Sequence, residues 1–444
     1  MTTPFTSSDP APAVSTLVVS GRSRERIAAT AQTLADWMAD SSELGGHDVP
    51  LVEVAHTLNH HRVSHPTFAT VCARDRAQAV TGLQALAGDR HSPGVVSPHV
   101  GECAPGTVFV YSGEGSQWAG MGRRLLAEEP VFAAAIADLE PVFADQVGFS
   151  LQQALTAGEP VHGNARVQPV LVGLQLALTT LWRSYGVHPD AVIGHSMGEV
   201  SAAVVAGGLS VADGLRVVAT RARLMTRLTG QGAVALLKLD STGTEALLAR
   251  YPGVSVTEHL SPRQTAVAGT PRQVDAVIDA VFAASRSGRR ATTEIASHTH
   301  FMDAILPELG SALDGLAPAV PTLPFLSTVV DPGETPDFDA RYWMANVREP
   351  VKFSRAVGAA ARSHATFIEI SPHPMLTQAI TETLAGAHHH SIGTLTRDGD
   401  DTMVFHTNVN AAHTVRPPST PHPGEPHHPW PSAPWLRTRQ KVQV

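Results

Sequence analysis

The chain has 444 residues, of which 43% are hydrophobic and 16% charged, with 36 glycines and 33 prolines. This composition is typical of a folded globular protein, and the length suits one large α/β unit with smaller attachments. The formal net charge of −8, with lysines and arginines scattered singly, excludes a basic nucleic-acid interface. The two cysteines, Cys72 and Cys103, lack the spacing of metal ligands or of a disulfide framework, which predicts a reducing, cytoplasmic setting.

The first 90 residues contain no targeting signal but a short α/β pattern. Residues 1–14 lack a basic segment followed by an apolar one, and nowhere does the chain approach the roughly 20 apolar residues that span a membrane. We therefore expect neither a secretion signal nor a membrane span. The pattern predicts a small α/β element made of strands at 17–19 and 68–72 and helices at 25–38 and 78–86. A connector rich in Gly, Pro and Ser follows at 91–105.

Two strand–turn–helix units come next. The apolar strand 108–111 stops at a glycine turn, 112–116, before a helix. A second helix, 170–185, leads to the strand 191–193, the sharp turn 194–198 and an Ala-rich helix. This alternation predicts a parallel sheet with covering helices.

From residue 233 the order of elements changes to the split pattern of ferredoxin-like domains. The predicted elements are a strand at 233–239, a helix at 244–250, strands at 254–257 and 265–268, a helix at 271–284 and a strand at 291–295. The chain then returns to the larger domain from residue 299, with strands near 325–329 and 366–370, so the smaller one is an insertion. Beyond residue 397 we expect irregular chain, and residues 417–434, rich in Pro and His, predict an extended strap.

The turn at 194–198, GHSMG, fits a nucleophile elbow, in which a tight strand-to-helix turn lifts a serine hydroxyl above the sheet. Taken alone, the motif also fits an ordinary tight turn with a capping serine. The β-branched strand before it and the Ala-rich helix after it favour a catalytic role for Ser196.

A serine nucleophile needs a base, and the chain has 23 histidines. Those at 388–390 and in 421–429 lie in polar, loop-like sequence without paired spacing, so we expect solvated loops and no metal site there. His298 follows the last strand of the insertion, at the junction with the main domain. Such a junction can bring a side chain over the elbow, although an isolated histidine is more often a surface or hydrogen-bonded residue.

Together these residues resemble the acyltransferase domains of type I polyketide synthases and the malonyl-CoA:acyl-carrier-protein transacylases. Residues 15–90 resemble the linker that joins a ketosynthase to such a domain. The tail that includes 405–408 and 434–436 resembles the linker after the domain, and its sequence is similar to that of synthases of phthiocerol or methyl-branched lipids. The resemblance runs through GEGSQW at 113–118, RVQP at 166–169, GHSMGE at 194–199, Arg221, ASHT at 296–299 and NVREPV at 346–351.

The resemblance and the element order imply an α/β fold with a hydrolase-like parallel-sheet core and an inserted ferredoxin-like subdomain, plus an N-terminal α/β linker domain. The expected core comprises residues 107–232 and 297–400, and the expected subdomain comprises 233–296. The linker on the ketosynthase side is expected at 1–106 and the linker after the acyltransferase at 401–444.

In the reaction that the resemblance implies, Ser196 attacks a coenzyme A thioester and His298 takes and returns the proton. The histidine is held by a main-chain carbonyl at Asn346 rather than by an acid, so the pair is a dyad. The amides of Met197 and Glu114 bind the oxyanion. The acyl group then passes to the phosphopantetheine thiol of an acyl carrier protein. The resemblance also implies an adjacent ketosynthase domain as a partner, and neither a bound cofactor nor a metal is expected.

The resemblance also implies the substrate class. Arg221 clamps the free carboxylate of a malonyl-type extender unit. Further substrate-binding positions are Gln168, Ser297 and His195. Small Ser297 favours methylmalonyl-CoA over malonyl-CoA, whereas Met197 lacks the Gln frequent in methylmalonyl-selective members.

Two residues depart from the family pattern, which has Gln at the position of Glu114 and frequently Asn at that of Leu260. A carboxylate near an anionic substrate is expected to slow acylation.

Three other functions are weighed against transfer. A malonyl-specific transferase and a serine hydrolase or thioesterase share the elbow and the dyad, and a docking module needs only the linkers. Arg221 and the inserted subdomain argue against the hydrolase. A dinucleotide site at 113–118 fails because Trp118 stands where the third glycine is required.

Overall fold

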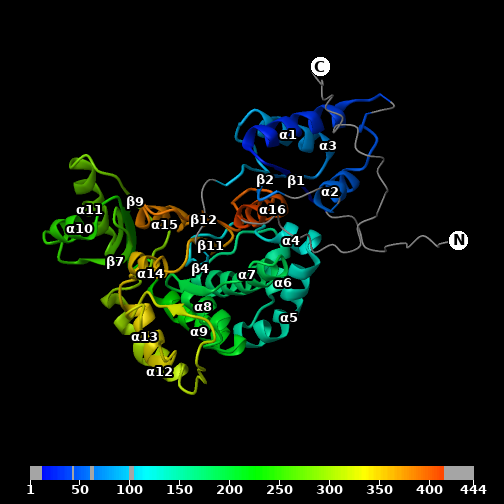
Figure 1. Ribbon diagram of the computed structural model, residues 1–444. Helices are drawn as coiled ribbons and strands as arrows, with labels where there is room; N and C mark the ends of the chain where they lie inside the picture. The colour runs from blue at the N-terminus through cyan, green and yellow to red at the C-terminus, as the bar shows by residue number, and fades with distance from the viewer. Residues whose placement is uncertain (1–12, 43–44, 61–64, 100–104, 415–444) are drawn as a thin grey trace. The chain divides into compact units, whose positions relative to one another are not determined.

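The computed structural model describes residues 13–42, 45–60, 65–99 and 105–414, which fall into two compact units (Figure 1). One unit comprises the described parts of Met1–Glu102, Ser184–Val187 and Asp400–Val444, and the other those of Cys103–Arg183 and His188–Gly399. The expected strap at 417–434 and all but the last two residues of the segment 1–14 lie outside the described residues. Within the described ranges no helix is long and apolar enough to cross a membrane.

The first unit is built on a small antiparallel sheet in the order β1–β2–β3. Its strands and N-terminal helices are β1 (Ser15–Gly21), α1 (Arg24–Ala39), α2 (Leu51–His60), β2 (Thr67–Ala73), α3 (Arg76–Ala87) and β3 (Val95–Val96). Leu17, Ile27, Leu34, Val71 and Leu83 form the centre of its apolar core. The two predicted strands and two predicted helices are confirmed, while α2 and β3 lie where the sequence predicted loop and connector.

Residues 401–412, expected to be irregular, form the helix α16 (Asp401–Ala412). The Asp400 side chain caps its first turn and accepts two hydrogen bonds of 2.6 Å from Arg74. Near the other end of the helix, Asn410 donates to the Cys72 sulfur over 3.0 Å. The helix was missed because its buried face carries polar residues, including Thr402 and Asn410, and so lacks apolar periodicity.

The second unit contains a five-stranded, wholly parallel sheet in the order β10–β5–β4–β11–β12, as the α/β prediction required. Its strands are β4 (Thr107–Tyr111), β5 (Ala191–Gly194), β10 (Phe325–Leu326), β11 (Thr366–Ile370) and β12 (His390–Ile392). Its helices are α4 (Arg123–Glu128), α5 (Pro130–Val147), α6 (Leu151–Thr156), α7 (Asn164–Ser184), α8 (Gly198–Ala206), α9 (Val211–Met225), α12 (Leu306–Ala312), α13 (Ala340–Arg348), α14 (Phe353–Ala360) and α15 (Thr377–Thr383).

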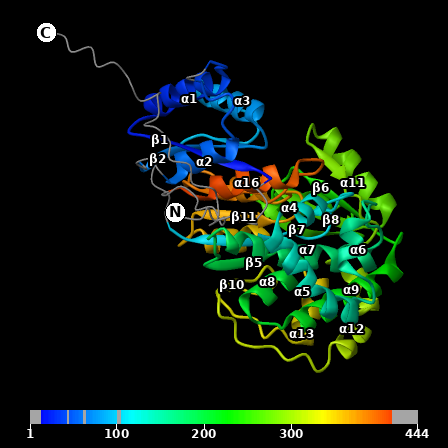
Figure 2. The same ribbon diagram turned by 90° about the vertical axis from the view of Figure 1, so that its right-hand side faces the viewer.

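Between α9 and α12 the same unit carries a four-stranded antiparallel sheet in the order β7–β8–β6–β9, which is the strand order of a ferredoxin-like domain. Figure 1 shows it with its two helices at the left of the unit, and Figure 2 shows it from the side. The elements are β6 (Ala233–Leu237), α10 (Ser241–Leu248), β7 (Val254–Ser261), β8 (Gln264–Gly269), α11 (Pro271–Ala283) and β9 (Gly288–Arg290).

The last strand of this subdomain was predicted at 291–295 but lies at β9. Its ladder with β6 ends where the Ala291 amide donates to the Val234 carbonyl. The prediction failed because β9 is an edge strand whose two arginines are exposed, so it shows no apolar signal.

The turns that follow β4 and β5 are packed against each other. A Cβ on Gly198 would overlap the carbonyl oxygen of Tyr111, which ends β4, so this position has no room for a side chain. Gln175 of α7 ties the turn after β4 to helix α8, since its amide nitrogen donates to the Ser112 carbonyl over 2.9 Å and its oxygen accepts from Ser201 over 2.6 Å. The carboxyl ends of two neighbouring parallel strands therefore form one rigid platform, where sites of α/β proteins lie.

Candidate active site

Ser196 lies between β5 and α8 with a φ of +55°, in the left-handed region that L-residues rarely adopt. Gly194 and Gly198 allow the turn, because a Cβ on Gly194 would overlap the backbone of Glu199. The strand, turn and helix predicted from the motif are thus present, and the serine hydroxyl is half-buried. Backbone strain of this kind costs roughly 1–3 kcal/mol, which the rigid platform must offset.

His298 lies next to this serine, with 2.8 Å between Ser196 Oγ and His298 Nε2. The histidine also has a positive φ, of +61°, and its side chain is only 2% exposed. Its amide donates to the Val347 carbonyl over 3.0 Å, which fixes the backbone at the junction where the inserted subdomain ends. The structure therefore brings together the two residues that the sequence selected separately.

The carbonyl that faces His298 Nδ1 belongs to Glu349, at 3.0 Å, and not to Asn346 as the resemblance suggested. Asn346 lies in α13, whereas Glu349 is the residue that ends that helix, where a carbonyl is free to accept from a side chain. With Nδ1 donating to this carbonyl, Nε2 is left without its proton and accepts from the serine hydroxyl.

Asn346 has a different place in the site. Its amide nitrogen donates to the Ser196 carbonyl over 3.1 Å and to Glu199 over 2.8 Å, and its amide oxygen accepts from Arg221 Nη1 over 2.6 Å. This one side chain therefore links the elbow backbone, a buried carboxylate and a buried guanidinium.

Glu199 is the functional neighbour that sequence reasoning missed. It is fully buried and also accepts from Tyr342 Oη over 2.6 Å and from the amide and hydroxyl of Thr328 over 2.7 and 2.9 Å. Burial raises its pKa, although these donors oppose the shift. The signal that could have found it was its place at the end of the GHSMGE motif, in the first turn of α8.

Arg221 projects from α9 into this network and is 1% exposed. Burial lowers its pKa to about 10, partly offset by the charges of Glu114 and Glu199, so the guanidinium stays charged at neutral pH. Within the described part of the chain its Nε has no hydrogen-bond partner. A buried charged donor without a partner is costly, and it points to a ligand that supplies the acceptor.

Glu114 and Gln168 lie on the same side of the elbow. Glu114 accepts hydrogen bonds of 3.1 Å from Asn164 and from Gln168, and burial raises its pKa despite Gln168 and the charge of Arg221. The Gln168 amide oxygen is buried and, in the described chain, has no partner. Met197 is the residue just before α8, so its amide lies at that helix N-terminus.

Comparison with known proteins agrees with this geometry. The sequence profile of the acyl transferase domain family matches residues 108–418. The chain belongs to this family. It is 54% identical over 442 residues to one component protein of the phenolphthiocerol/phthiocerol polyketide synthase of Mycobacterium tuberculosis, covering 97% of the chain but only 28% of that relative. The chain thus spans about a quarter of the length of such relatives.

Two solved structures resemble this acyltransferase domain. The acyltransferase domain from module 8 of the salinomycin polyketide synthase is 35% identical with a TM-score of 0.81, over 91% of this chain and 96% of that one. The acyltransferase domain of the polyketide synthase PpsC of Mycobacterium tuberculosis is 53% identical with a TM-score of 0.65, over 72% of this chain and 98% of that one.

Three further positions singled out in the sequence have distinct environments in the acyltransferase domain. Ser297 is half-buried directly before His298. His195 is 7% exposed and points to Glu258, with 3.4 Å between Nε2 and Oε2, rather than to Arg221. Leu260 is buried in the apolar cluster on the parallel sheet, so a polar residue there would lose that packing.

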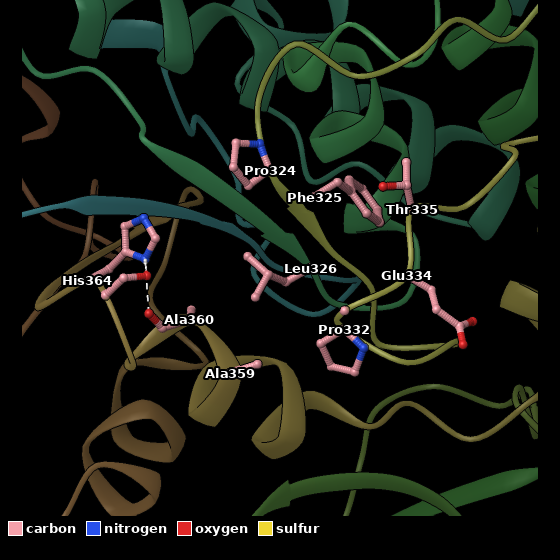
Figure 3. Close-up of a pocket in the computed structure, with 11 residues that line it drawn as sticks. Pro324, Phe325, Leu326, Pro332, Glu334, Thr335, Ala359, Ala360 and His364 are labelled. Atoms are coloured by element: carbon pink, nitrogen blue, oxygen red, sulfur yellow. Dashed lines mark hydrogen bonds between the residues drawn. The ribbon is translucent and has the colours of Figure 1, made fainter.

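A pocket of about 280 Å³ lies at the edge of the parallel sheet, beside β10 (Figure 3). Phe325 and Leu326 come from that strand and Ala359 from α14, and the loop with Glu334 and Thr335 closes the other side. None of the site residues described above lines it, and its His364 is hydrogen-bonded to the Ala360 carbonyl at 2.9 Å. This pocket is therefore separate from the elbow.

The electrostatics of His298 predict how the reactivity of Ser196 depends on pH. Burial, with the charges of Arg221 and His195, lowers the His298 pKa to about 4, although Glu258 opposes the shift. We expect the labelling rate of Ser196 by a fluorophosphonate to stay constant between about pH 7 and about pH 5 and to fall only at lower pH, because the base is lost on protonation. A decline centred near 6.5, the ordinary histidine value, would contradict this.

Proposed function

We propose that this domain transfers a malonyl-type acyl group from coenzyme A to the phosphopantetheine thiol of an acyl carrier protein, through an ester on Ser196. The observation that carries the proposal is the 2.8 Å contact between Ser196 and His298, beside a buried guanidinium whose Nε lacks a partner in the described chain. Membership of the acyltransferase family supports the general part of this proposal, because coenzyme A thioesters and carrier proteins are the usual substrates of such domains.

In the first half-reaction Ser196 Oγ attacks the thioester carbonyl while His298 Nε2 takes the hydroxyl proton. The 3.0 Å contact from Nδ1 to the Glu349 carbonyl holds the ring in the tautomer that can accept this proton. The amides of Met197 and Glu114 are proposed to bind the oxyanion, because they lie on the two turns packed against each other. The tetrahedral intermediate then collapses, the coenzyme A sulfur leaves with the proton from His298, and the acyl group stays on Ser196.

In the second half-reaction the carrier's thiol occupies the place that coenzyme A left. His298 takes the thiol proton, the sulfur attacks the ester carbonyl, and the bond to Ser196 Oγ breaks as His298 returns a proton to that oxygen. In both half-reactions His298 Nε2 passes a proton between Ser196 Oγ and a thiol sulfur, in opposite directions. Because one site serves both thiols, the kinetics are expected to be ping-pong.

Arg221 is proposed to bind the free carboxylate of the extender unit. Its Nη1 donates to Asn346, which orients the guanidinium. Its Nε, which has no partner among the described residues, is left to donate to the substrate. Gln168 lies in the same region, and we assign it a supporting place in the acyl pocket. His195 faces Glu258, so we do not place it among the groups that contact the extender.

We propose methylmalonyl-CoA as the favoured extender and malonyl-CoA as the alternative. The argument is steric: Ser297, beside the base, leaves room for a methyl branch. Met197 does not support this preference, because methylmalonyl-selective members frequently have Gln at that position. One methyl group in an apolar pocket is worth about 1–3 kcal/mol, so the expected preference is modest.

The proposal also covers partners and setting. An adjacent ketosynthase, a carrier protein and a cytoplasmic location are inferred from the polyketide synthase relatives, whose length the chain covers only in part. The division into linker, core and ferredoxin-like segments is proposed on the same basis. A thioesterase remains the rival function, because the dyad would also serve hydrolysis.

The first experiment follows the acyl group. Exposed to methylmalonyl-CoA, the wild-type protein is expected to gain one methylmalonyl mass on Ser196 and to pass it to an added holo-carrier protein. The S196A variant should gain none, whereas S311A, which removes an exposed hydroxyl on α12, should behave as wild type. Intact-mass spectrometry and thin-layer analysis of free acid measure the outcome. Predominant free acid would establish a hydrolase, and no adduct would favour a docking module.

The second experiment tests the carboxylate clamp. Arg221→Ala is expected to lower kcat/KM for methylmalonyl-CoA about 100-fold, the loss expected for a buried charge-assisted pair, and to lower that for acetyl-CoA only a few-fold. Arg223→Ala is the matched control, because this arginine is exposed on the same helix and pairs with Glu308. Equal losses of kcat/KM for both thioesters in the Arg221 variant would contradict a role of Arg221 in binding the carboxylate.

The third experiment tests extender choice. With both thioesters in competition, Ser297→Phe is expected to shift the product ratio about tenfold toward malonyl, because the ring fills the space of the branch. The ratio is read from the masses on the carrier protein. A strong malonyl preference in the wild-type domain would refute the role given to Ser297.

A further inference from the structure

A buried contact between a histidine and a carboxylate joins the nucleophile turn to the inserted subdomain and has no part in the reaction as proposed above. His195 Nε2 lies 3.4 Å from Glu258 Oε2, and the imidazole packs edge-on against Phe353 with 5.7 Å between ring centroids. His195 directly precedes Ser196, while Glu258 comes from β7 of the small antiparallel sheet. The contact thus joins the turn after β5 of the parallel sheet to β7 of the antiparallel sheet.

The backbone holds Glu258 in register with the segment that orients the base. A β-bulge interrupts β7 between Val256 and Glu258. On either side of Glu258 the strand is bonded to Val351, whose amide donates to Thr257 and whose carbonyl accepts from His259, each over 2.8 Å. Val351 follows Glu349, the carbonyl partner of His298, by two residues. The same short segment therefore fixes both Glu258 and the base.

On its other side the His195 ring lies against the turn that follows β4. A Cβ on Gly113 would lie 3.2 Å from His195 Nδ1, so the imidazole reaches the residue directly before Glu114. The amide of Glu114 is one of the two donors proposed for the oxyanion. A charge on His195 would therefore act on the place where negative charge develops in the transition state.

Glu258 on β7 contacts His195, and Glu369 on β11 and Glu199 on α8 act on it electrostatically. Burial by itself lowers the His195 pKa, but these charges outweigh it and the pKa is raised. The neighbouring His298 is shifted the opposite way, to about 4, by burial and by the charges of Arg221 and His195. Two histidines in one site are thus driven toward opposite protonation states, which is how active sites separate a base from a cation.

We propose that Glu258 is a positioning residue that holds His195 as an imidazolium beside Ser196, so that the oxyanion turn carries a fixed positive charge while His298 remains the neutral base. This inference rests on the proposed acyl transfer for its kinetic consequence, but the charge of His195 does not depend on it.

The pair predicts a specific response to Glu258→Gln, which keeps the shape of the side chain and removes its charge. A buried imidazolium without its counter-ion gives up its proton, so the His195 pKa should fall below its ordinary value. Acylation of Ser196 should then slow by about tenfold near neutral pH, equivalent to ~1.4 kcal/mol of barrier. The alkaline limb of the wild-type rate, where His195 loses its proton, should move to lower pH.

The experiment combines an NMR titration of the His195 ring with single-turnover acylation by methylmalonyl-CoA across the pH range. It compares wild type with E258Q, H195Q, the double variant and E258D. E294Q is the matched control, because Glu294 is an exposed carboxylate close to the same junction. We expect E258Q and H195Q to lose the same rate, the double variant to lose no more than either, and E258D to restore part of the rate and of the His195 pKa.

Three results would overturn the inference: a wild-type His195 that titrates at or below its ordinary pKa, a His195 pKa that E258Q leaves unchanged, or rate losses that multiply in the double variant. Failure of the proposed function looks different, because no variant would then be acylated while the NMR titration would still report the charge. Unfolding of E258Q would show as loss of dispersed NMR signals, and E258D would then carry the comparison.

Discussion

The site depends on one short contact, the 2.8 Å between Ser196 Oγ and His298 Nε2, made by two residues that both have a positive φ. Neither backbone conformation is stable by itself, so surrounding structure must hold each one. The packed turns after β4 and β5 hold the serine, and hydrogen bonds to Val347 and Glu349 hold the histidine. The proton transfer proposed for this pair thus relies on the packing of three separate chain segments rather than on a third acidic group.

The neutral side chain of Asn346 links the charged groups around this contact by hydrogen bonds. It contacts Arg221, Glu199 and the Ser196 carbonyl at once, so the guanidinium proposed to bind the substrate carboxylate and the elbow share a support. Glu199 accepts hydrogen bonds from Thr328 and Tyr342, and these donors oppose the rise in its pKa that burial causes. A substrate carboxylate would enter a network that is already oriented, with little rearrangement at the moment of reaction.

Sequence reasoning selected Ser196 from the elbow motif and its flanking elements, whereas His298 and Arg221 depended on the resemblance to the acyltransferase family. It predicted the parallel sheet because strand and helix periods alternate. It placed the carbonyl partner of His298 at Asn346, since any residue supplies a main-chain oxygen and only coordinates distinguish Glu349. Glu258 escaped for a related reason: a bulge in β7 sets the direction of its side chain, and a bulge leaves no signature in composition. Helix α16 was missed because its buried face carries polar residues, which give no apolar periodicity in the sequence.

The packing of α16 has a consequence for how the chain acquires its structure during synthesis. Asn410 and Cys72 are 338 residues apart, yet they meet in the same small unit, as do Arg74 and Asp400. While a ribosome is still making the intervening sequence, the three N-terminal strands lack the helix that covers Cys72 and Thr16. Contacts this distant along the chain form slowly, because closing a long loop costs entropy before it gives any return. The large parallel-sheet unit can thus mature before the small unit, which is complete only once α16 has been made.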